Sequence, residues 1–320
     1  LLTVQQFQRA AALICACEAI RLGEGVPVDM SCDLAGIPIS LGLWVGGEAT
    51  PNNFVDAEKS LRDDNAHSRP DHLKYCPNHA TNKLVWKADS GRKEIRAYCT
   101  EKTCLWNEES QGLPVWTVDN DIYRARPSLV IGTIDKFAQV ARKAETVSLF
   151  GLDSKCRQPD LIIQDELHLI SGPLGTMTGL YEVAIDRLCS SDDIRPKIIA
   201  STATIRQAST QIKALFNRTT CLFPSPVLDA ENSGFAVEDK SAPGREYVGI
   251  TTAGRSAKFV LQAVAASLMQ SAASSSVTDE FRDDFWTQVS YFNSLRELGG
   301  ALVLMQDDVT RSLAEYASRR

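Results

Sequence analysis

The sequence predicts an α/β protein built on a parallel sheet with helices on both faces. Three apolar runs rich in β-branched residues are each followed by a helical pattern: "SLVIGT" (128–133), "LIIQDE" (161–166) and "KIIASTAT" (197–204). Strands that alternate with helices imply right-handed crossovers and therefore parallel strands. Such sheets place their ligand sites at the carboxyl ends of the strands, where the polar residues of these runs fall.

The composition is that of an ordinary globular protein long enough for two domains. Of the 320 residues, 44% are hydrophobic and 23% are charged, and no apolar run approaches the roughly 18 residues of a membrane span. The N-terminus lacks both an initiator Met and a signal-peptide pattern, so we expect a cytoplasmic protein and a chain cut from a longer one. The net charge of −6 argues against bulk attraction to nucleic acid but allows a local binding groove.

The remaining elements follow from the same patterns. Residues 4–22 have helical spacing, and "IPISLGLWVGG" (37–47) is a strand that closes on a Gly pair. The later runs "EYVGITT" (246–252) and "GGALVLM" (299–305) predict two strands around helices at 256–272 and 285–298. We therefore expect a first domain, a polar insertion, a Pro-containing linker and the start of a second α/β domain, at 1–47 with 127–222, 48–126, 223–245 and 246–320.

An acid pair follows the predicted strand in "LIIQDELHLISG" (161–172). In nucleotide hydrolases, an acid at such a strand end holds Mg²⁺, and its neighbour polarises the water that attacks the γ-phosphate. Asp165 and Glu166 are the candidates for these two roles. Alternatively, the pair caps a helix near residue 174 or ends the strand in solvent.

Two further strand ends carry hydroxyl residues. The segment "ASTAT" (200–204) could bond the acid pair on a neighbouring strand, and "GTIDK" (132–136) could hold a nucleic-acid phosphate on its backbone amides. Each segment is also typical of a plain helix start, with Thr204 as the N-cap in the first case.

The order of these motifs resembles the first motor domain of superfamily 2 helicases of the DExH type. In chain order they are "LLTVQQ" (1–6), "GG" (46–47), "GTIDK", "DELH" (165–168) and "STAT" (201–204). The resemblance implies a RecA-like fold, ATP and Mg²⁺ as cofactors, and nucleic acid as a partner. Longer strings resemble the helicase subunit of the bacterial DISARM anti-phage system and its DUF1998-associated relatives, among them "DELHLISGPLGTMTGLYE" (165–182) and "YFNSLRELGGA" (291–301).

The resemblance also implies roles for individual residues. Asp165 would hold Mg²⁺, Glu166 would activate water, and His168 would connect the nucleotide site with the interdomain cleft, unless it is a solvent-exposed histidine at a helix start. Coupling of hydrolysis to domain closure would fall to Ser201, Thr202 and Thr204. The residues implied to contact nucleic acid are Thr3, Gln6, Gly46, Gly47, Thr133, Lys136 and Asn293, although the Gly pair also suits a strand-ending turn.

In this family a Gly-Lys-Thr phosphate loop precedes the first motif, and an arginine-bearing motif lies farther along the second domain. Neither occurs in the 320 residues, so we expect the isolated chain to show no nucleic-acid-stimulated ATP turnover. The DISARM resemblance favours DNA over RNA and implies a partner defence subunit and no membrane. The alternatives are an RNA helicase or a remodeller of protein–nucleic acid complexes, and an inactive RecA-like scaffold. Against the scaffold, buried adjacent acids are costly unless they hold a metal.

The expected insertion carries "CPNH" (76–79) and "CTEKTC" (99–104). Cys76, His79, Cys99 and Cys104 can close a tetrahedral zinc site, and a polar insertion with little core of its own would need such a metal to fix its fold. The alternative is scattered buried thiols with an exposed histidine. Nine cysteines without a paired framework favour a reducing compartment, and we expect the other cysteines to be packing residues.

Overall fold

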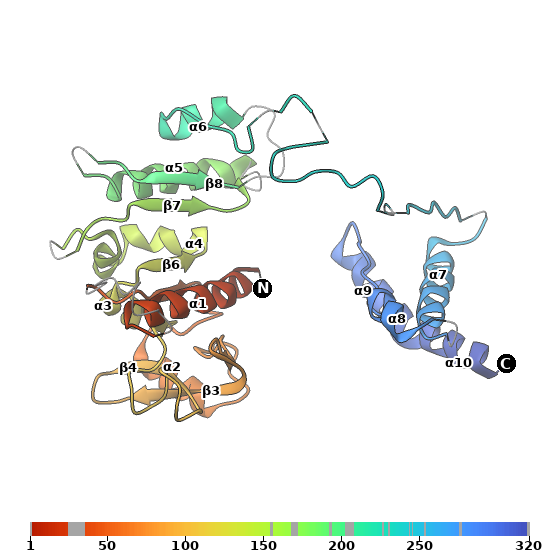
Figure 1. Cartoon of the computed structure of the whole chain (residues 1–320), viewed down its shortest axis with the longest axis horizontal. Helices are drawn as coiled ribbons and strands as arrows, with labels where there is room; N and C mark the ends of the chain where they lie inside the picture. Colours follow the sequence, from red (N-terminus) through yellow and green to blue (C-terminus); the bar gives the residue numbers. More distant parts are fainter. Residues whose placement is uncertain are drawn as a thin grey trace. The chain divides into compact units, whose positions relative to one another are not determined.

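The structure is a computed structural model that describes residues 2–24, 36–153, 156–167, 172–191, 194–201, 208–225, 227–229, 231–242, 244, 246–252, 254–274 and 277–318. The chain divides into two compact units, Leu1–Phe223 and Pro224–Arg320. Both are drawn in Figure 1, and each is described by itself below.

Parallel strands form the framework of the first unit. In its described residues, β1 (Leu41–Trp44) lies between β5 (Val115–Trp116) and β6 (Leu129–Gly132), and β7 (Leu161–Gln164) pairs with β8 (Lys197–Ala200). Every one of these pairs is parallel, so the mixed α/β class with a parallel sheet is confirmed. Strand β5 falls inside the range 48–126 expected for the insertion, so the parallel sheet takes part of that segment.

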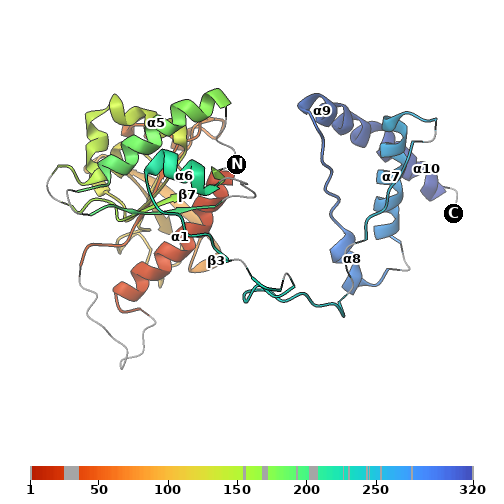
Figure 2. The same cartoon turned by 90° about the horizontal axis from the view of Figure 1, so that it is seen from above.

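Helices connect and flank these strands. Phe7, Ala11 and Ile14 lie on one side of the first helix, α1 (Leu2–Arg21), and pack against Leu41 and Leu43 of β1 in one buried cluster. Figures 1 and 2 together show α1 and α5 on opposite sides of the strands. None of the described helices is long and apolar enough to span a bilayer. Besides α1 and α2 (Phe54–Arg62), the described helices of this unit are α3 (Asp119–Ala125), α4 (Ile134–Phe137), η2 (Ala138–Ala141), η3 (Ala144–Phe150), α5 (Gly172–Leu188) and α6 (Ala208–Phe216).

The β7–β8 pair departs from the expected sheet with helices on both faces. Both strands alternate between exposed and half-buried residues, and Leu161, Ile163 and Ile199 are 46%, 63% and 46% exposed. None of these three side chains belongs to a hydrophobic cluster of the described residues, whereas α1 packs on the strands β1 and β6.

An antiparallel sheet fills much of the expected insertion. After α2 (Phe54–Arg62), the strands β2 (Tyr75–Cys76), β3 (His79–Asp89) and β4 (Glu94–Cys99) pair in that order. Strand β4 alternates half-buried and buried residues, and its Ala97 joins Leu73 and Trp106 in the cluster that contains Phe7. The segment therefore shares its largest core with α1 and the parallel sheet, because its own two-residue and hairpin strands enclose little apolar volume.

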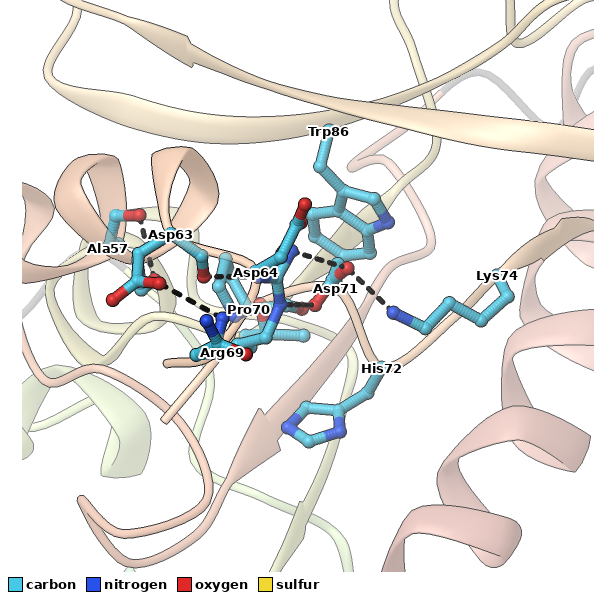
Figure 3. A network of polar contacts seen from close by, with 12 residues as sticks. Ala57, Asp63, Asp64, Arg69, Pro70, Asp71, His72, Lys74 and Trp86 are labelled. Atoms are coloured by element: carbon cyan, nitrogen blue, oxygen red, sulfur yellow. Dashed lines mark hydrogen bonds and ion pairs between the residues drawn. The ribbon is translucent and has the colours of Figure 1, made fainter. Parts of the chain in front are cut away.

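Charged side chains hold the segment between α2 and β2 (Figure 3). Arg69 donates to Asp71 Oδ1 at 2.9 Å and to the backbone oxygen of Asp63 at 2.6 Å, and Lys74 Nζ donates to Asp71 Oδ2 at 2.6 Å. Burial alone would raise the pKa of Asp71, but the hydrogen bonds from the two cations outweigh it and lower the pKa to about 2. Trp86 Nε1 donates to the backbone oxygen of Leu73 at 2.9 Å, which attaches this segment to β3.

Asp121 of α3 gives the first unit a testable pH dependence. It is 1% exposed and accepts from Ile95 N of β4 at 2.9 Å, and burial raises its pKa from 3.8 to about 6 despite that bond and Arg124. A carboxyl group whose pKa is higher in the folded than in the unfolded state stabilises the fold fully at a pH below its unfolded pKa. This stabilisation is lost as the pH rises through its folded pKa. We therefore expect the free energy of unfolding to fall between about pH 4 and about pH 6, and this fall to flatten in Asp121→Asn.

Urea denaturation across that pH range measures the effect. An Asp64→Asn variant controls for the loss of one charge, since the Asp64 side chain is fully exposed. Identical pH profiles for Asp121→Asn and the unsubstituted protein would contradict a buried, proton-retaining Asp121.

The second unit is helical in its described residues and differs from the predicted α/β domain. Residues 246–252 have no regular structure, and 299–305 fall almost entirely within a helix. Ser294 Oγ accepts from Glu297 N at 3.2 Å as an N-cap, and the Leu and Ala residues that follow are strong helix formers. A strand here would also need a partner, which the described part of this unit does not provide. The helix expected at 256–272 is confirmed, whereas the helix expected at 285–298 is wrong. The described helices of this unit are α7 (Ala257–Ala272), α8 (Asp279–Phe285), α9 (Leu295–Leu304), η5 (Met305–Val309) and α10 (Thr310–Ser318).

Candidate functional site

The carboxyl ends of β7 and β8 bring two predicted residues together. Gln164 pairs with Ala200 in the parallel register, so Asp165 and Ser201 are the next residues on neighbouring strands. Ser201 Oγ donates to Asp165 Oδ1. Ser201 N donates to Gln164 O at 2.9 Å, and Leu167 N donates to Ser201 O at 3.0 Å. The hydroxyl residue of one strand is thereby held against the acid of the other.

A third predicted residue reaches the same carboxylate from the start of the chain. Gln6 Nε2, on the first turns of α1, donates to Asp165 Oδ2 at 2.5 Å. The backbone N–H of Glu166 donates to Asp165 Oδ1 at 3.0 Å. The bond from Ser201, followed by those from Gln6 and Glu166, lowers the pKa of Asp165, so the carboxylate stays ionised at neutral pH.

The Asp165 carboxylate retains room for a cation. A carboxylate oxygen has two lone pairs to share. Oδ1 accepts from Ser201 and Glu166, whereas Oδ2 accepts from Gln6. Oδ2 thus has one lone pair left on a side chain that is exposed to solvent. An ionised oxygen of this kind suits a hard divalent cation such as Mg²⁺, bound directly or through water.

Glu166 adopts a backbone conformation that is uncommon for its residue type. Its φ is +53°, in the left-handed region that costs a non-glycine residue about 1–2 kcal/mol. The backbone N–H of Glu166 also donates to Ser201 Oγ, at a distance of 3.3 Å. Strained non-glycine residues of this type cluster at functional sites, where surrounding contacts hold them in place.

The exposure of Asp165 corrects one expectation. The argument against an inactive scaffold assumed that the acid pair is buried, but Asp165 is exposed and Glu166 is half-buried. Ser201, directly after β8, is exposed as well. The support for a functional carboxylate therefore comes from its three convergent donors and its lowered pKa, and not from the cost of burial.

Several predicted site residues are not joined to this cluster. His168, Thr202 and Thr204 lie outside the described residues. Thr3 is half-buried near the start of α1, and Asn293 lies in the second unit, where its N–H donates to Glu297 Oε2 at 3.1 Å.

Lys136 has a structural position instead of the predicted phosphate contact. Its side chain is 1% exposed, and Nζ lies 2.8 Å from Asp119 Oδ2 and donates to Asn52 Oδ1 at 2.9 Å. An ammonium enclosed by a carboxylate and an amide has no surface to offer a phosphate. Lys136 is therefore not a candidate for contact with nucleic acid. Thr133, three residues earlier, is the N-cap residue of α4 but makes no side-chain capping bond.

The two partners of Lys136, Asn52 and Asp119, were not predicted from the sequence. Asn52 also explains Gly47, because a Cβ at Gly47 would lie 2.9 Å from Asn52 Nδ2. A Cβ at Gly46 would meet nothing within 4 Å. The second glycine of the pair thus permits a close approach, whereas the first is not required by packing.

The four predicted metal ligands form a second compact group. Their sulfur and nitrogen atoms all lie within 4.8 Å of one another, and Cys76, Cys99 and Cys104 are buried while His79 is half-buried. Cys76 Sγ lies 3.8 Å from Cys104 Sγ, and Cys99 Sγ lies 3.9 Å from His79 Nδ1. Its three cysteines belong to the same buried cluster as Cys15 of α1.

Comparison with characterised proteins identifies a relative along nearly the whole chain. The sequence is 34% identical, over an alignment 368 positions long, to the DISARM protein DrmA of Bacillus paralicheniformis, and the match covers 98% of this chain. The chain is close to DrmA. The resemblance to the DISARM helicase subunit that the motifs suggested is thereby confirmed at the level of sequence similarity.

The same comparison limits what DrmA says about these residues. The match covers 32% of DrmA, so the chain spans about a third of the length of that protein. No protein-family model matches the chain. The roles of individual residues consequently rest on the geometry of the Asp165 cluster and not on the DrmA name.

Proposed function

We propose that this chain is part of an ATP-driven nucleic-acid motor, a helicase or translocase of the superfamily 2 DExH type with a RecA-like first domain. One observation carries the proposal: Gln6, Asp165 and Ser201 come from three separate motifs and meet at a single carboxylate. A cluster of this kind would let the metal ligand, the α1 helix and the β8 strand end respond together to nucleotide.

Each residue of the cluster has a proposed task. Asp165 holds Mg²⁺ of Mg-ATP through Oδ2, and Glu166 orients and polarises the attacking water. Ser201 couples the nucleotide state to the β8 end, since its hydroxyl shares Asp165 with the metal. Gln6 belongs to the nucleotide site and not to the nucleic-acid track, because its amide already binds Asp165. By resemblance alone, His168, Thr202 and Thr204 would complete this site, and Thr3, Gly46, Gly47, Thr133 and Asn293 would contact nucleic acid.

The similarity to DrmA supports the biological setting of the proposal. DrmA is named as a DISARM protein, and we infer from this a role in anti-phage defence in the cytoplasm, with DNA as the nucleic acid and other DISARM subunits as partners. Contacts to a phosphate backbone carry little sequence information, so DNA binding is expected to be salt-sensitive and sequence-tolerant.

ATP turnover by the full-length protein, with and without single-stranded DNA or RNA, tests the proposed function. We expect Mg²⁺-dependent turnover that DNA stimulates and that rising salt weakens. Stimulation by RNA alone would replace DNA with RNA as the partner. Turnover that no nucleic acid changes, or no turnover at all in a folded full-length protein, would overturn the motor and favour a scaffold.

A further inference from the structure

We propose that Cys76, His79, Cys99 and Cys104 bind one zinc ion, through three thiolates and the Nδ1 atom of His79. Tetrahedral zinc has Zn–S distances of about 2.3 Å, which place two ligand sulfurs about 3.8 Å apart. The Cys76 and Cys104 sulfurs are 3.8 Å apart. The Cys99 sulfur and His79 Nδ1 are 3.9 Å apart, and all four atoms fall within 4.8 Å. One sulfur pair thus has the separation of two zinc ligands, and all four atoms are close enough to surround a single ion after small side-chain shifts. This argument does not depend on the proposed function.

Local structure brings the four ligands together from two short segments. The irregular β2–β3 turn sets Cys76 opposite His79, and Cys99 ends β4. Cys99 N donates to Trp106 O at 2.8 Å, which folds the following loop back so that Cys104 faces Cys76. Neither segment alone supplies more than two ligands, so a bound metal would join the two segments.

The surroundings suit three thiolates and a zinc ion, which together carry a charge of −1. Backbone N–H groups point at two of the sulfurs, with Glu101 N donating to Cys99 Sγ at 3.4 Å and Trp106 N donating to Cys104 Sγ at 3.5 Å. Such amides stabilise sulfur that carries negative charge. The ligand set contains no carboxylate, and soft thiolate ligands favour zinc over Mg²⁺ or Ca²⁺.

The site would be structural, and it would support α1. All four coordination positions are filled by protein, which leaves none for substrate. Cys76, Cys99 and Cys104 lie in the same core as Phe7, Ala11 and Ile14 of α1. A metal bound there would add a cross-link to the hydrogen bonds and core contacts of this segment, so it would help to fix the layer on which α1 rests.

Metal content and cobalt spectroscopy test the site. Protein expressed with zinc should contain one zinc ion per chain, and Co²⁺ exchanged into it should give the intense visible bands of tetrahedral cobalt with thiolate charge transfer. Cys99→Ser and Cys104→Ser should each lose most of the zinc. The matched control is Cys15→Ser, because Cys15 is 3% exposed in the same core but is not a ligand; this variant should keep the full zinc content.

A measurement on the unsubstituted protein guards against variants that fail to fold. Chelation of the metal from folded protein should lower the melting temperature and expose Cys76, Cys99 and Cys104 to alkylation, and zinc should reverse both changes. Absence of zinc and of tetrahedral cobalt bands would overturn the proposal. So would a Cys76–Cys104 disulfide in the purified protein, or full zinc retention in both ligand variants.

Discussion

Lys136→Met is expected to lower the free energy of unfolding by about 3–5 kcal/mol, the cost of removing one partner from a buried ion pair. Methionine fills a similar volume but removes the ammonium that lies 2.8 Å from Asp119 Oδ2. The Asp119 side chain is fully buried, and its remaining cation is Lys143 at 3.6 Å. Tyr123 OH donates to the same carboxylate oxygen at 3.3 Å but carries no charge. A buried carboxylate with this little compensation destabilises the first unit.

A double variant separates the ion pair from simple packing loss. Lys136→Met combined with Asp119→Asn removes both charges, so it should be more stable than Lys136→Met alone, as measured by urea denaturation. The exposed pair Lys87–Glu108 provides a control, because Lys87→Met should cost less than about 1 kcal/mol. A loss below that value for Lys136→Met would contradict the buried position and return Lys136 to the nucleic-acid contacts.

Glu166→Gln in the full-length protein is expected to lower DNA-stimulated ATP turnover roughly 10²–10⁴-fold, the usual contribution of a general base. The amide keeps the size of the side chain but cannot accept a proton from the attacking water. Nucleotide affinity should change little, because Asp165, the proposed metal ligand, accepts a hydrogen bond from the backbone N–H of Glu166, and that group is unaffected. The loss should therefore appear in kcat and not in KM.

The matched control is Glu109→Gln, a change at an exposed glutamate in the loop between β4 and β5. It should keep normal turnover. Glu166→Gln with near-normal kcat would remove Glu166 from the chemistry, whereas a large rise in KM at unchanged kcat would assign it to nucleotide binding.

The first helix and the strands β1, β6, β7 and β8 of the first unit follow from local patterns in the sequence, whereas the elements between residues 48 and 126 do not. Apolar β-branched runs predict β6, β7 and β8, and parallel pairing then carries Asp165 and Ser201 to neighbouring strand ends. The contact of Gln6 with Asp165 does not follow from any local pattern, because it joins residues 159 positions apart. The order of the motifs implied that Gln6 contacts nucleic acid, so its position at the Asp165 carboxylate was not predicted.

The incorrect expectations have a common physical cause. Residues 299–305 are apolar enough for a strand or a helix, and the outcome depends on whether partner strands exist. Lys136 follows a plausible phosphate-binding turn, but its partners Asn52 and Asp119 lie in other segments. The exposure of the apolar side chains on β7 and β8 likewise depends on which segments of the chain pack against these strands. In each case the deciding contact is long-range, and no single stretch of sequence contains it.

Electron paramagnetic resonance of Mn²⁺ tests the central claim most directly, because Mn²⁺ replaces Mg²⁺ at carboxylate sites. The full-length protein is mixed with Mn²⁺ and a non-hydrolysable ATP analogue, and bound metal is compared in the unsubstituted protein, Asp165→Asn and Glu109→Gln. We predict nucleotide-dependent Mn²⁺ binding in the unsubstituted protein and in Glu109→Gln, and its loss in Asp165→Asn. Equal Mn²⁺ binding in Asp165→Asn would contradict the assignment of Asp165 as the metal ligand.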